Sequence, residues 1–356
     1  MRDSSKAMFD YLSEDKRFEV KYLINDKKTF KKLREDFGDK IVSSASFEGK
    51  KFMFLANVWL LDGGMPTKNV FYFFNKIIVN FWHGIPIKKV GIEGYRGLNW
   101  LRMYLQLRLF SLFVTAYTVP TSRLTGIFAT SFLLPHHKIK VLGQPKNDLL
   151  LEGPDEVKHQ ELFAEFKNGE RFVLYAPTWR ESKYGTGLGS SVSFFPFDDF
   201  DIQAFNRFLV RENIVFFMRP HYLEPQTFER MSNIRMVGSD TVTEVSDILP
   251  AFDMVISDYS SIYLDFLLLD RPVLLLPYDL EEYRAVKGLN FRFDDINPGP
   301  DVSSLSSFQK AVLKLLNMPN YYAKDRTALK TYFHQIPSGS RGAVRAFILE
   351  EFNKTK

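Results

Sequence analysis

The sequence predicts an α/β protein made of two Rossmann-like domains that face each other across a cleft. Three observations support this prediction. Short apolar runs alternate with helix-length segments in both halves of the chain. The 356 residues exceed the ~250–300 at which single hydrophobic cores stop growing. The polar stretch 151–170 interrupts the alternation, which then restarts.

The first half opens with about 50 polar, lysine-rich residues and then shows its apolar runs. We expect a helix near 26–37 in the polar part. The apolar runs that predict strands are 51–61, 71–81, 111–119 and 139–143. The segments between them that predict helices are 97–110 and 122–132.

The second half repeats this alternation after a polar boundary segment that contains a helix. Its predicted strands are 171–176, 213–218, 233–237, 252–256 and 272–276. Its predicted helices are 199–212, 243–250, 261–270 and 280–287. A Gly/Ser-rich loop is expected at 183–197. We place the domains at 1–152 and 153–337, with a last amphipathic helix within 338–356.

Composition excludes several classes of function. The chain has no cysteine, which rules out disulfides and thiolate chemistry and suits a reducing cytoplasm. We see no signal peptide, and the longest uncharged stretches are shorter than the ~20 residues of a membrane-spanning helix. The net charge of +5 suits an anionic partner, whether a nucleotide, a phosphopolymer or a lipid surface.

The run WHGIPIKK (82–89) holds the first candidate site residue, His83. A histidine after a strand and before Gly84 and a proline sits on a tight turn, where its imidazole can act as a base. The alternative is a structural histidine. Lys88 and Lys89 can attract phosphate, or they can simply be a solvated surface pair.

Two motifs in the second half present phosphate-binding groups at predicted strand ends. In RPH (219–221), Arg219 can donate two hydrogen bonds to a phosphate and His221 can neutralise its charge. In SDYSS (257–261), Asp258 or Ser260 can cap the next helix. The hydroxyls of Ser260 and Ser261 and the first N–H groups of that helix can cradle phosphate.

Further strand-end residues complete the candidate set. Thr178 and Arg180 follow the first strand of the second half. Asp279, Glu281 and Glu282 follow another, where a carboxylate can hold ribose hydroxyls or Asp279 can cap a helix. Asn147 and Asp148 follow the last strand of the first half, and we expect a structural role for them.

Familiar cofactor motifs are missing from the sequence. We find no P-loop, no dinucleotide-binding G-x-G-x-x-G and no H-E-x-x-H zinc site. We therefore expect no required cofactor. Mg²⁺ remains open as a contributor, although the sequence shows no metal site. Recognised nucleic-acid modules are also missing, so we expect no nucleic-acid partner.

Taken in order, the motifs resemble those of the CDP-glycerol glycerophosphotransferase family of teichoic acid and capsule synthesis. The matching runs are WHGIPIKKVG (82–91), VLGQPKNDLL (141–150), YAPTWRE (175–181), RPH (219–221), ISDYSSIYLDF (256–266), RPVLLLPYDLEEY (271–283) and GLNFRFDDINPGP (288–300). The resemblance implies a GT-B fold, with the donor bound mainly by the second domain and the last helix packed on the first. It also implies transfer of an alditol phosphate from a CDP-alditol, with release of CMP.

The resemblance assigns roles to individual residues. His83 matches the proposed base and His221 a second essential histidine. The positions that match the donor-binding loops are Thr178, Arg180, Asp258, Ser260 and Ser261. The chain departs from the family pattern at Gln144, Lys146, Lys287 and Asn290, which leaves glycerol or ribitol open as the alditol.

We further expect a lipid-linked or polymeric acceptor, with Gly84 and Lys88 on its side of the site. The segment 97–113 has the composition of a membrane-interface helix, and a helix buried against the sheet is the alternative. We therefore predict a cytoplasmic protein that associates peripherally with the inner face of the bacterial membrane. The lysines expected to aid this are Lys27, Lys28, Lys31 and Lys32.

Two other functions remain open at this stage. One is a GT-B glycosyltransferase that uses a nucleotide sugar. The other is a non-catalytic scaffold that binds nucleotides or polymers. The identity of the product separates the first from alditol-phosphate transfer, and substitution of His83 and His221 separates the second.

Overall fold

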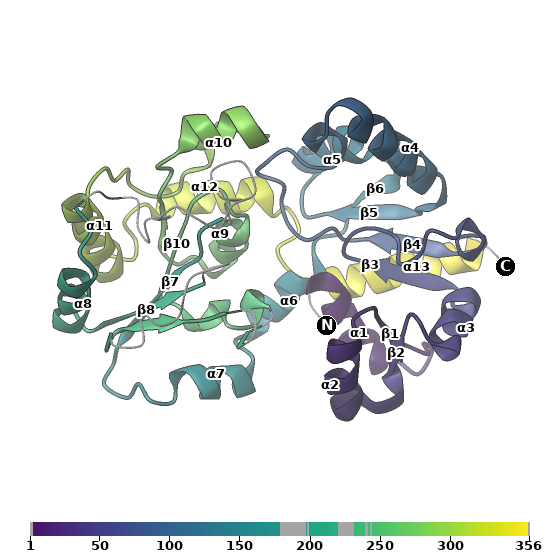
Figure 1. The fold of residues 1–356 in the computed structure, drawn as a ribbon, viewed down its shortest axis with the longest axis horizontal. Coiled ribbons are helices and arrows are strands. Elements are labelled where there is room, and N and C mark those ends of the chain that lie inside the picture. The colour runs from purple at the N-terminus through teal and green to yellow at the C-terminus, as the bar shows by residue number, and fades with distance from the viewer. Residues whose placement is uncertain are drawn as a thin grey trace. The chain divides into compact units, whose positions relative to one another are not determined.

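A computed structural model of the chain describes residues 3–178, 197, 199–219, 231–238, 241–242 and 244–354. The chain divides into two compact units. The first comprises Met1–Gly84, Gly91–Leu149 and His334–Lys356, and the second comprises Ile85–Val90 and Leu150–Phe333. The sequence places Ile85–Val90 in the first domain, whereas the structure packs this segment into the second unit. Figure 1 shows the elements of both units.

The first unit is built on a parallel sheet of four strands in the order β3-β4-β5-β6. The strands are β3 (Val58–Leu61), β4 (Ile77–Asn80), β5 (Ala116–Val119) and β6 (Ile139–Val141). All residues of β4 and β5 are buried, as expected for inner strands covered on both faces. Because the strands are parallel, their carboxyl ends share one edge of the sheet, and the loops after β3 and β4 lie side by side there.

The described part of the first unit also contains α-helices around its sheets, besides the helix of the small sheet described below. They are α1 (Asp3–Ser13), α3 (Phe47–Leu55), α4 (Gly97–Phe113), α5 (Thr125–Phe132), α6 (Pro145–Glu152, which runs into the second unit) and α13 (Ser340–Lys354). On one side, α1 and α13 pack on β4, with Met8, Val79 and Val344 in a common core. The C-terminal helix therefore belongs to the first unit (Figure 1).

A second, small sheet lies in the N-terminal part of the first unit. Its parallel strands β1 (Tyr22–Ile24) and β2 (Ile41–Ser43) are connected by α2 (Lys27–Phe37). The side chain of Asp26 caps α2 by accepting a hydrogen bond from the Thr29 N–H at 2.7 Å. Phe30 packs this helix onto the small sheet, which leaves its lysine side exposed.

The second unit is built on a parallel sheet of five strands in the order β11-β10-β7-β8-β9. The strands are β7 (Arg171–Tyr175), β8 (Ile214–Met218), β9 (Ile234–Met236), β10 (Met254–Ser257) and β11 (Val273–Leu275). The chain order runs outward from β7 in both directions, so the topological switch point lies between β7 and β10. Ligands of doubly wound sheets bind at the carboxyl ends of strands beside such a point.

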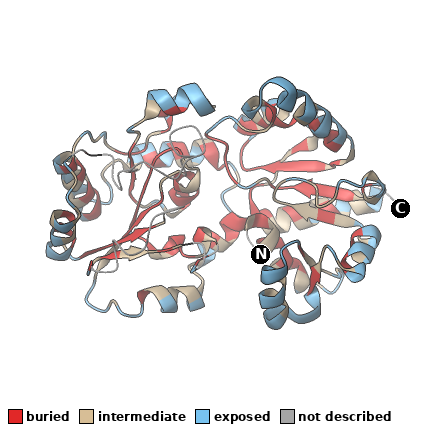
Figure 2. Cartoon of the chain, viewed as in Figure 1, coloured by how far each residue is buried: buried red, intermediate tan, exposed pale blue. Residues whose placement is uncertain are grey.

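Helices flank this sheet as well. They are α7 (Glu156–Phe163), α8 (Ile202–Arg211), α9 (Ile262–Phe266), α10 (Leu280–Lys287), α11 (Leu305–Asn317) and α12 (Ala323–Phe333). One core joins Phe205 of α8 and Phe308 of α11 to β7 and β8 (Figure 2). Among the described helices of both units, none has the length and apolar character needed to cross a membrane.

The α/β class and the alternation of elements are confirmed, and several boundaries are corrected. The apolar run 51–61 is helix α3 followed by β3, so only its last residues form a strand. The segment 243–250 contains short 3-10 turns, among them Val245–Asp247, in place of the expected α-helix. The loop 183–197 lies almost wholly outside the described residues.

Candidate active site

The turn after β4 is held in one shape by its own side chains. Asn80, the last residue of β4, is buried, and its side-chain oxygen accepts a hydrogen bond from the Trp82 N–H at 2.9 Å. Its amide donates to the carbonyl of Gly63. Trp82 adopts a left-handed φ of 56°, and Gly84 has a φ of 143°, which suits glycine. The backbone therefore turns sharply on both sides of His83.

His83 stands exposed on this turn, at the carboxyl edge of the first unit's sheet. Its ring lies 4.0 Å from the ring of Trp82, measured between centroids. Its Nδ1 is 3.4 Å from the main-chain oxygen of Asp62. A carbonyl oxygen can only accept, so this contact suits a ring that carries a hydrogen on Nδ1, and in the neutral form of that ring the lone pair is on Nε2.

Asp62 follows β3 at the same edge. Its carboxyl accepts hydrogen bonds from the N–H of Ser5, at 3.1 Å, and from the Ser5 hydroxyl. The Ser5 hydroxyl also lies 2.8 Å from the hydroxyl of Tyr22. Burial, together with the nearby Asp3, raises the pKa of Asp62 to about 7 against the opposing effects of Ser5 and Lys146.

The raised pKa of Asp62 predicts a pH-dependent stability. The folded chain binds this proton more tightly than an unfolded chain, whose carboxyl has a pKa near 3.8. The stabilisation from the proton is therefore complete below about pH 4 and is lost as the pH rises through about 7. Asp62→Asn keeps an acceptor for Ser5 but has no carboxyl that can titrate, so this pH-dependent stabilisation is absent from the variant.

Thermal unfolding of both proteins between pH 4 and pH 8 tests this expectation. The melting temperature of the wild type should fall relative to that of Asp62→Asn across this range. Two parallel curves would show that the Asp62 carboxyl does not titrate between these limits.

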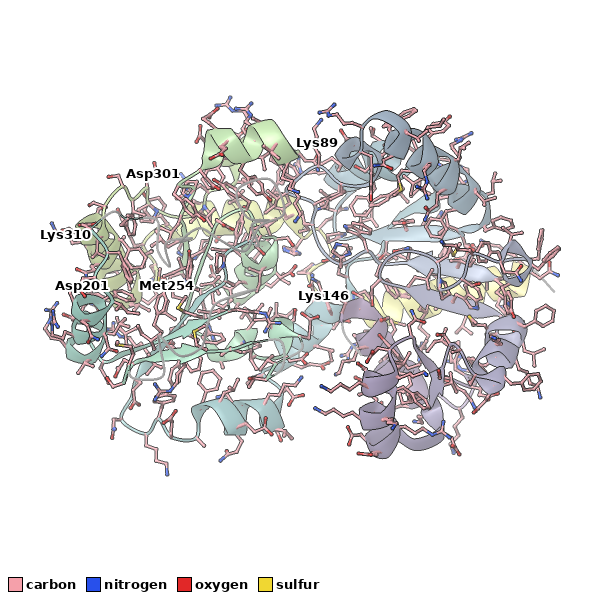
Figure 3. The ribbon with its side chains drawn as sticks, in the orientation of Figure 1. Lys89, Lys146, Asp201, Met254, Asp301 and Lys310 are labelled. Carbon is pink, nitrogen blue, oxygen red and sulfur yellow. The ribbon has the colours of Figure 1, made fainter. Side chains whose placement is uncertain are left out.

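Residues of α6 serve the packing of the first unit. Asp148 accepts hydrogen bonds from the N–H groups of Ser340, at 3.1 Å, and Arg341, at 2.8 Å. It therefore caps the N-terminus of α13, which is the structural role expected of it. Lys146 is buried with its ammonium 3.9 Å from the carboxylate of Asp3 (Figure 3).

In the second unit, Asp258 joins the loops that follow β7 and β10. Its Oδ1 accepts hydrogen bonds from the N–H of Thr178 at 2.8 Å, the hydroxyl of Thr178 at 2.6 Å and the N–H of Tyr259 at 2.6 Å. The side chain is 1% exposed. The expectation that Asp258 caps the following helix is therefore wrong. Its carboxylate fixes the two loops at the topological switch point instead.

Ser260 and Ser261 lie half-buried at the start of α9. Ser261 occupies the N-cap position, and its hydroxyl makes no capping hydrogen bond. The Ser260 hydroxyl lies 3.5 Å from the N–H of Ile262, at the limit of a hydrogen bond. Both serines are therefore partly accessible to solvent at this edge of the sheet.

Asp279 is half-buried beside these loops. It holds the N-cap position of α10 and makes no capping hydrogen bond, so the capping alternative is wrong. Its Oδ1 accepts a hydrogen bond from the Tyr259 hydroxyl at 3.1 Å. Tyr259 in turn stacks on Tyr283, with ring centroids 4.1 Å apart. Glu281 and Glu282 are exposed on the first turn of α10.

Arg219 follows β8 at the same sheet edge. Its N–H donates to the Tyr175 carbonyl at 3.0 Å, and its Nη1 donates to the Val242 carbonyl at 2.8 Å. Burial lowers the pKa of the guanidinium, which still remains charged at neutral pH. Arg180 and His221 lie outside the described residues.

The two predicted acceptor-side residues fall in different units. Gly84 is buried and ends a segment of the first unit. Lys88 belongs to the second unit, where its main chain forms an antiparallel bridge with Leu289 and its side chain is exposed. Within the described parts of the chain, no three acidic or histidine side chains gather as a metal site.

Sequence reasoning overlooked Asp62, Asn80 and Tyr259. The rule that singled out Asp258 also applies to Asp62, because both are carboxylates directly after an apolar strand. Asn80 is a polar residue that closes an apolar strand just before the histidine turn, which is a second usable signal. Nothing in the sequence marks Tyr259 as the residue that connects Asp279 to the loop after β10.

The chain is similar in sequence to a known family and to several characterised bacterial proteins. Residues 1–345 match the family described as CDP-Glycerol:Poly(glycerophosphate) glycerophosphotransferase. The chain is 25% identical over 353 residues to the teichoic acid glycerol-phosphate transferase of Staphylococcus aureus (strain NCTC 8325 / PS 47), covering 95% of the chain and 86% of that protein. It is 25% identical to the teichoic acid poly(glycerol phosphate) polymerase of Bacillus subtilis (strain 168), covering 89% of the chain and 42% of the polymerase.

Solved structures show the same fold. The wall teichoic acid polymerase TagF matches with a TM-score of 0.79 at 20% identity, over 99% of this chain and 86% of that one. A histidine-to-asparagine variant of TagF, soaked with CDPG, gives a TM-score of 0.78 at 20% identity over 99% and 87%. A protein from Listeria monocytogenes named 'putative UDP-N-acetylglucosamine 2-epimerase' matches with a TM-score of 0.59 at 13% identity, over 99% of this chain and 94% of that one. The fold is thus of the GT-B type, and the chain belongs to the CDP-glycerol:poly(glycerophosphate) glycerophosphotransferase family.

Proposed function

We propose that this protein transfers an alditol phosphate, with glycerol phosphate as the first choice, from a CDP-alditol to a hydroxyl group of a lipid-linked or polymeric acceptor. The observation that carries the proposal is the arrangement of His83. An exposed imidazole on a rigid turn, with Nδ1 directed at a carbonyl, offers Nε2 as a general base. The family match and the names of the relatives support the same chemistry.

In this reaction the acceptor oxygen attacks the β-phosphorus of the donor in line. The bond between the β-phosphorus and the bridging oxygen breaks, and CMP leaves with that oxygen. His83 takes the proton of the attacking hydroxyl. Phosphoryl transfer depends on positioning and charge stabilisation, so the protein needs no covalent intermediate. Gly84 and Lys88 are proposed to contact the acceptor.

The second unit is proposed to bind the donor. Arg219 and His221 face the diphosphate charge in this proposal, and Ser260 and Ser261 donate hydroxyl hydrogen bonds to it. Asp258 keeps Thr178 and its neighbouring loop in place, and Arg180 follows Thr178 by two residues in the sequence. We assign the ribose hydroxyls to Asp279 and Glu282. We propose that no cofactor is required, and an assay with and without EDTA tests whether Mg²⁺ contributes.

Donor identity is the direct test of this function. The purified protein is incubated with an acceptor lipid and with CDP-glycerol, CDP-ribitol or a nucleotide sugar, and the products are weighed by mass spectrometry. We expect CMP and an acceptor heavier by one or more glycerol-phosphate units. Gain of ribitol phosphate would change the alditol only. Gain of a sugar would replace the proposal with glycosyl transfer, and no product from any donor would favour a scaffold.

We also propose that the protein binds the inner face of the cell membrane through its first unit. Three segments of this unit expose large apolar side chains, and we call them together the apolar face. Its residues are Phe47, Phe54 and Leu55 of α3, Phe71 and Phe74 of the following loop, and Leu98, Leu101, Leu105, Leu109 and Leu112 of α4. Ring contacts connect the segments, between Phe54 and Tyr72 at 6.0 Å and between Phe74 and Phe113 at 5.3 Å.

The apolar face includes α4, the segment 97–113 that the sequence suggested as a membrane-interface helix, and adds residues of α3 and of the loop after β3. Phe71 is 73% exposed and Leu98 is 75% exposed, and isolated soluble domains rarely leave so many large apolar side chains in one area. A lipid surface accepts such side chains, and the exposed lysines of α2 can add attraction to anionic headgroups.

Flotation with anionic liposomes tests membrane binding. We expect the wild type to float at low salt, and the variant Phe71→Ser/Leu98→Ser/Leu105→Ser to remain largely in the soluble fraction. Val157→Ser is the matched control, because Val157 is 67% exposed on α7 in the second unit. If the wild type stays unbound, or if the control loses as much binding as the triple variant, the apolar face is not a membrane-binding surface.

A further inference from the structure

The segment that directly follows the base turn is packed into the second unit. We call Ile85–Val90 the strap. Ile85 is 1% exposed and Ile87 is 2% exposed, so the strap is anchored by two buried side chains. Only Gly84 separates it from His83. The main chain that carries the proposed base is therefore continuous with a segment that the second unit holds.

Hydrogen bonds fasten the strap to the residues that follow α10. The N–H of Lys89 donates to the Gly288 carbonyl at 3.2 Å, and the N–H of Asn290 donates to the Ile87 carbonyl at 2.8 Å. Lys88 and Leu289 form the antiparallel bridge between these two contacts. The pairing is a short piece of β-structure, with a single bridge to keep it in register.

The side chain of Asn290 adds a second set of contacts to this pairing. Its Nδ2 donates to the carbonyl of Pro86 at 2.9 Å and to the carbonyl of Lys88 at 3.1 Å. One amide nitrogen therefore uses both of its hydrogens on the strap. The Asn290 side chain thus holds the carbonyls of Pro86 and Lys88. These contacts add to the main-chain hydrogen bonds and to the burial of Ile85 and Ile87.

Gly288 lets the strap approach this closely. It has a φ of 69°, and a Cβ at this position would lie 2.8 Å from the Cδ of Lys89. Figure 3 shows Lys89 beside the end of α10. The N–H of Gly288 also closes α10 by donating to the Arg284 carbonyl at 3.0 Å. The strap thus rests against the end of α10.

The other end of α10 reaches the loop that follows β10. Asp279, at the N-cap of α10, accepts the hydrogen bond from Tyr259, and Tyr283 of α10 stacks on the Tyr259 ring. Tyr259 lies between Asp258 and Ser260 in the proposed donor-phosphate loop. A continuous series of contacts therefore runs from that loop through α10 to Asn290 and the strap.

We propose that Asn290 is a positioning residue for His83. Its side-chain amide fixes the strap, which holds the main chain on the C-terminal side of His83, while Asn80 holds it on the N-terminal side. This inference rests on the proposed function, because it requires His83 to accept the proton. Asn290 itself touches neither donor nor acceptor in this scheme, so its removal should affect turnover more than donor binding.

Asn290→Asp tests this role, since it keeps the size of the side chain and replaces the two N–H donors with an oxygen facing two carbonyls. We expect kcat to fall roughly 10- to 100-fold, because small misplacements of a reacting group have effects of this order. The KM for CDP-glycerol should change by less than about 3-fold. Asn290→Ala, which removes the donors without the repulsion, should shift kcat in the same direction.

A double variant separates positioning from a general loss of structure. If Asn290 acts through the base, His83→Ala/Asn290→Asp should turn over no more slowly than His83→Ala alone. Asn206→Ala is the matched control, because the Asn206 side chain also makes two hydrogen bonds, to Ser232 at 3.3 Å and from the Asn233 N–H at 3.1 Å. We expect this control to keep wild-type turnover.

Two results would overturn the inference. The first is a kcat of Asn290→Asp and of Asn290→Ala within about 2-fold of the wild type. The second is a double variant slowed by the full Asn290→Asp factor relative to His83→Ala. If His83→Ala itself kept full activity, the assignment of the base would fail, and the inference would fail with it. Failure of the base assignment can be told apart from failure of the Asn290 inference alone, because it appears already in the single variant His83→Ala.

Discussion

Replacing His83 with alanine is expected to lower kcat by about 10²–10⁴-fold, the usual contribution of a general base. The physical reason is the proposed role of the exposed His83 imidazole, whose Nδ1 lies 3.4 Å from the Asp62 carbonyl, so that Nε2 is the nitrogen proposed to take the proton. The donor should still bind, because its proposed ligands lie in the second unit. Steady-state kinetics with CDP-glycerol should therefore show a large loss in kcat and a small change in the donor KM.

Two further variants sharpen this test. His83→Gln keeps a polar side chain on the turn without a basic nitrogen, so its kcat should be as low as that of His83→Ala. His137→Ala, at an exposed position in the same unit, should keep wild-type turnover. Near-wild-type turnover in both His83 variants would exclude His83 as the base. An equal loss in His137→Ala would point to a general effect of removing surface histidines.

The candidate site was predictable from sequence where a strand ends in a polar residue. His83, Asp258 and Arg219 each follow a buried strand, and parallel strands bring such residues to one edge of their sheet. What each side chain does there was less predictable. Asp258 looked like a helix cap because acidic and hydroxyl residues begin helices in general, yet it bonds to Thr178, which is 80 positions earlier. Local sequence carries no information about such a distant partner.

The same limit explains the errors in the fold. The second unit has strands that are buried on both faces, and their continuous apolar runs gave nearly correct boundaries. In the run 51–61, apolar residues belong first to α3, whose Phe54 and Leu55 are exposed, and only then to β3. Composition alone does not distinguish a short apolar run in an exposed helix from a short apolar run in a buried strand.

Asn290 shows how a departure from the family pattern acquires meaning only in the structure. In the sequence it is one of the positions at which the chain departs from the pattern of the family that it resembles. In the fold it donates to two carbonyls of the strap.

Removing the Asp258 carboxylate is expected to destabilise the second unit by about 3–5 kcal/mol, because Asp258→Ala leaves three donors without their acceptor in a buried site. Those donors are the N–H and hydroxyl of Thr178 and the N–H of Tyr259. Asp258→Asn retains an oxygen at the same place and should lose less. Urea unfolding of the variants, followed by the midpoint and the slope, measures the difference.

Asp253 provides the matched control at the opposite end of β10. It is exposed and accepts one hydrogen bond from the Phe172 N–H at 2.7 Å, so Asp253→Ala should cost less than about 1 kcal/mol. Both carboxylates join β10 to β7, but only Asp258 does so at the edge where the donor is proposed to bind. The donor KM should therefore rise in Asp258→Asn and stay unchanged in Asp253→Ala. If the two variants changed stability and KM equally, Asp258 would be an ordinary strand-connecting residue. If Asp258→Asn raised KM with little loss of stability, the carboxylate would organise the donor loop without contributing much to the fold.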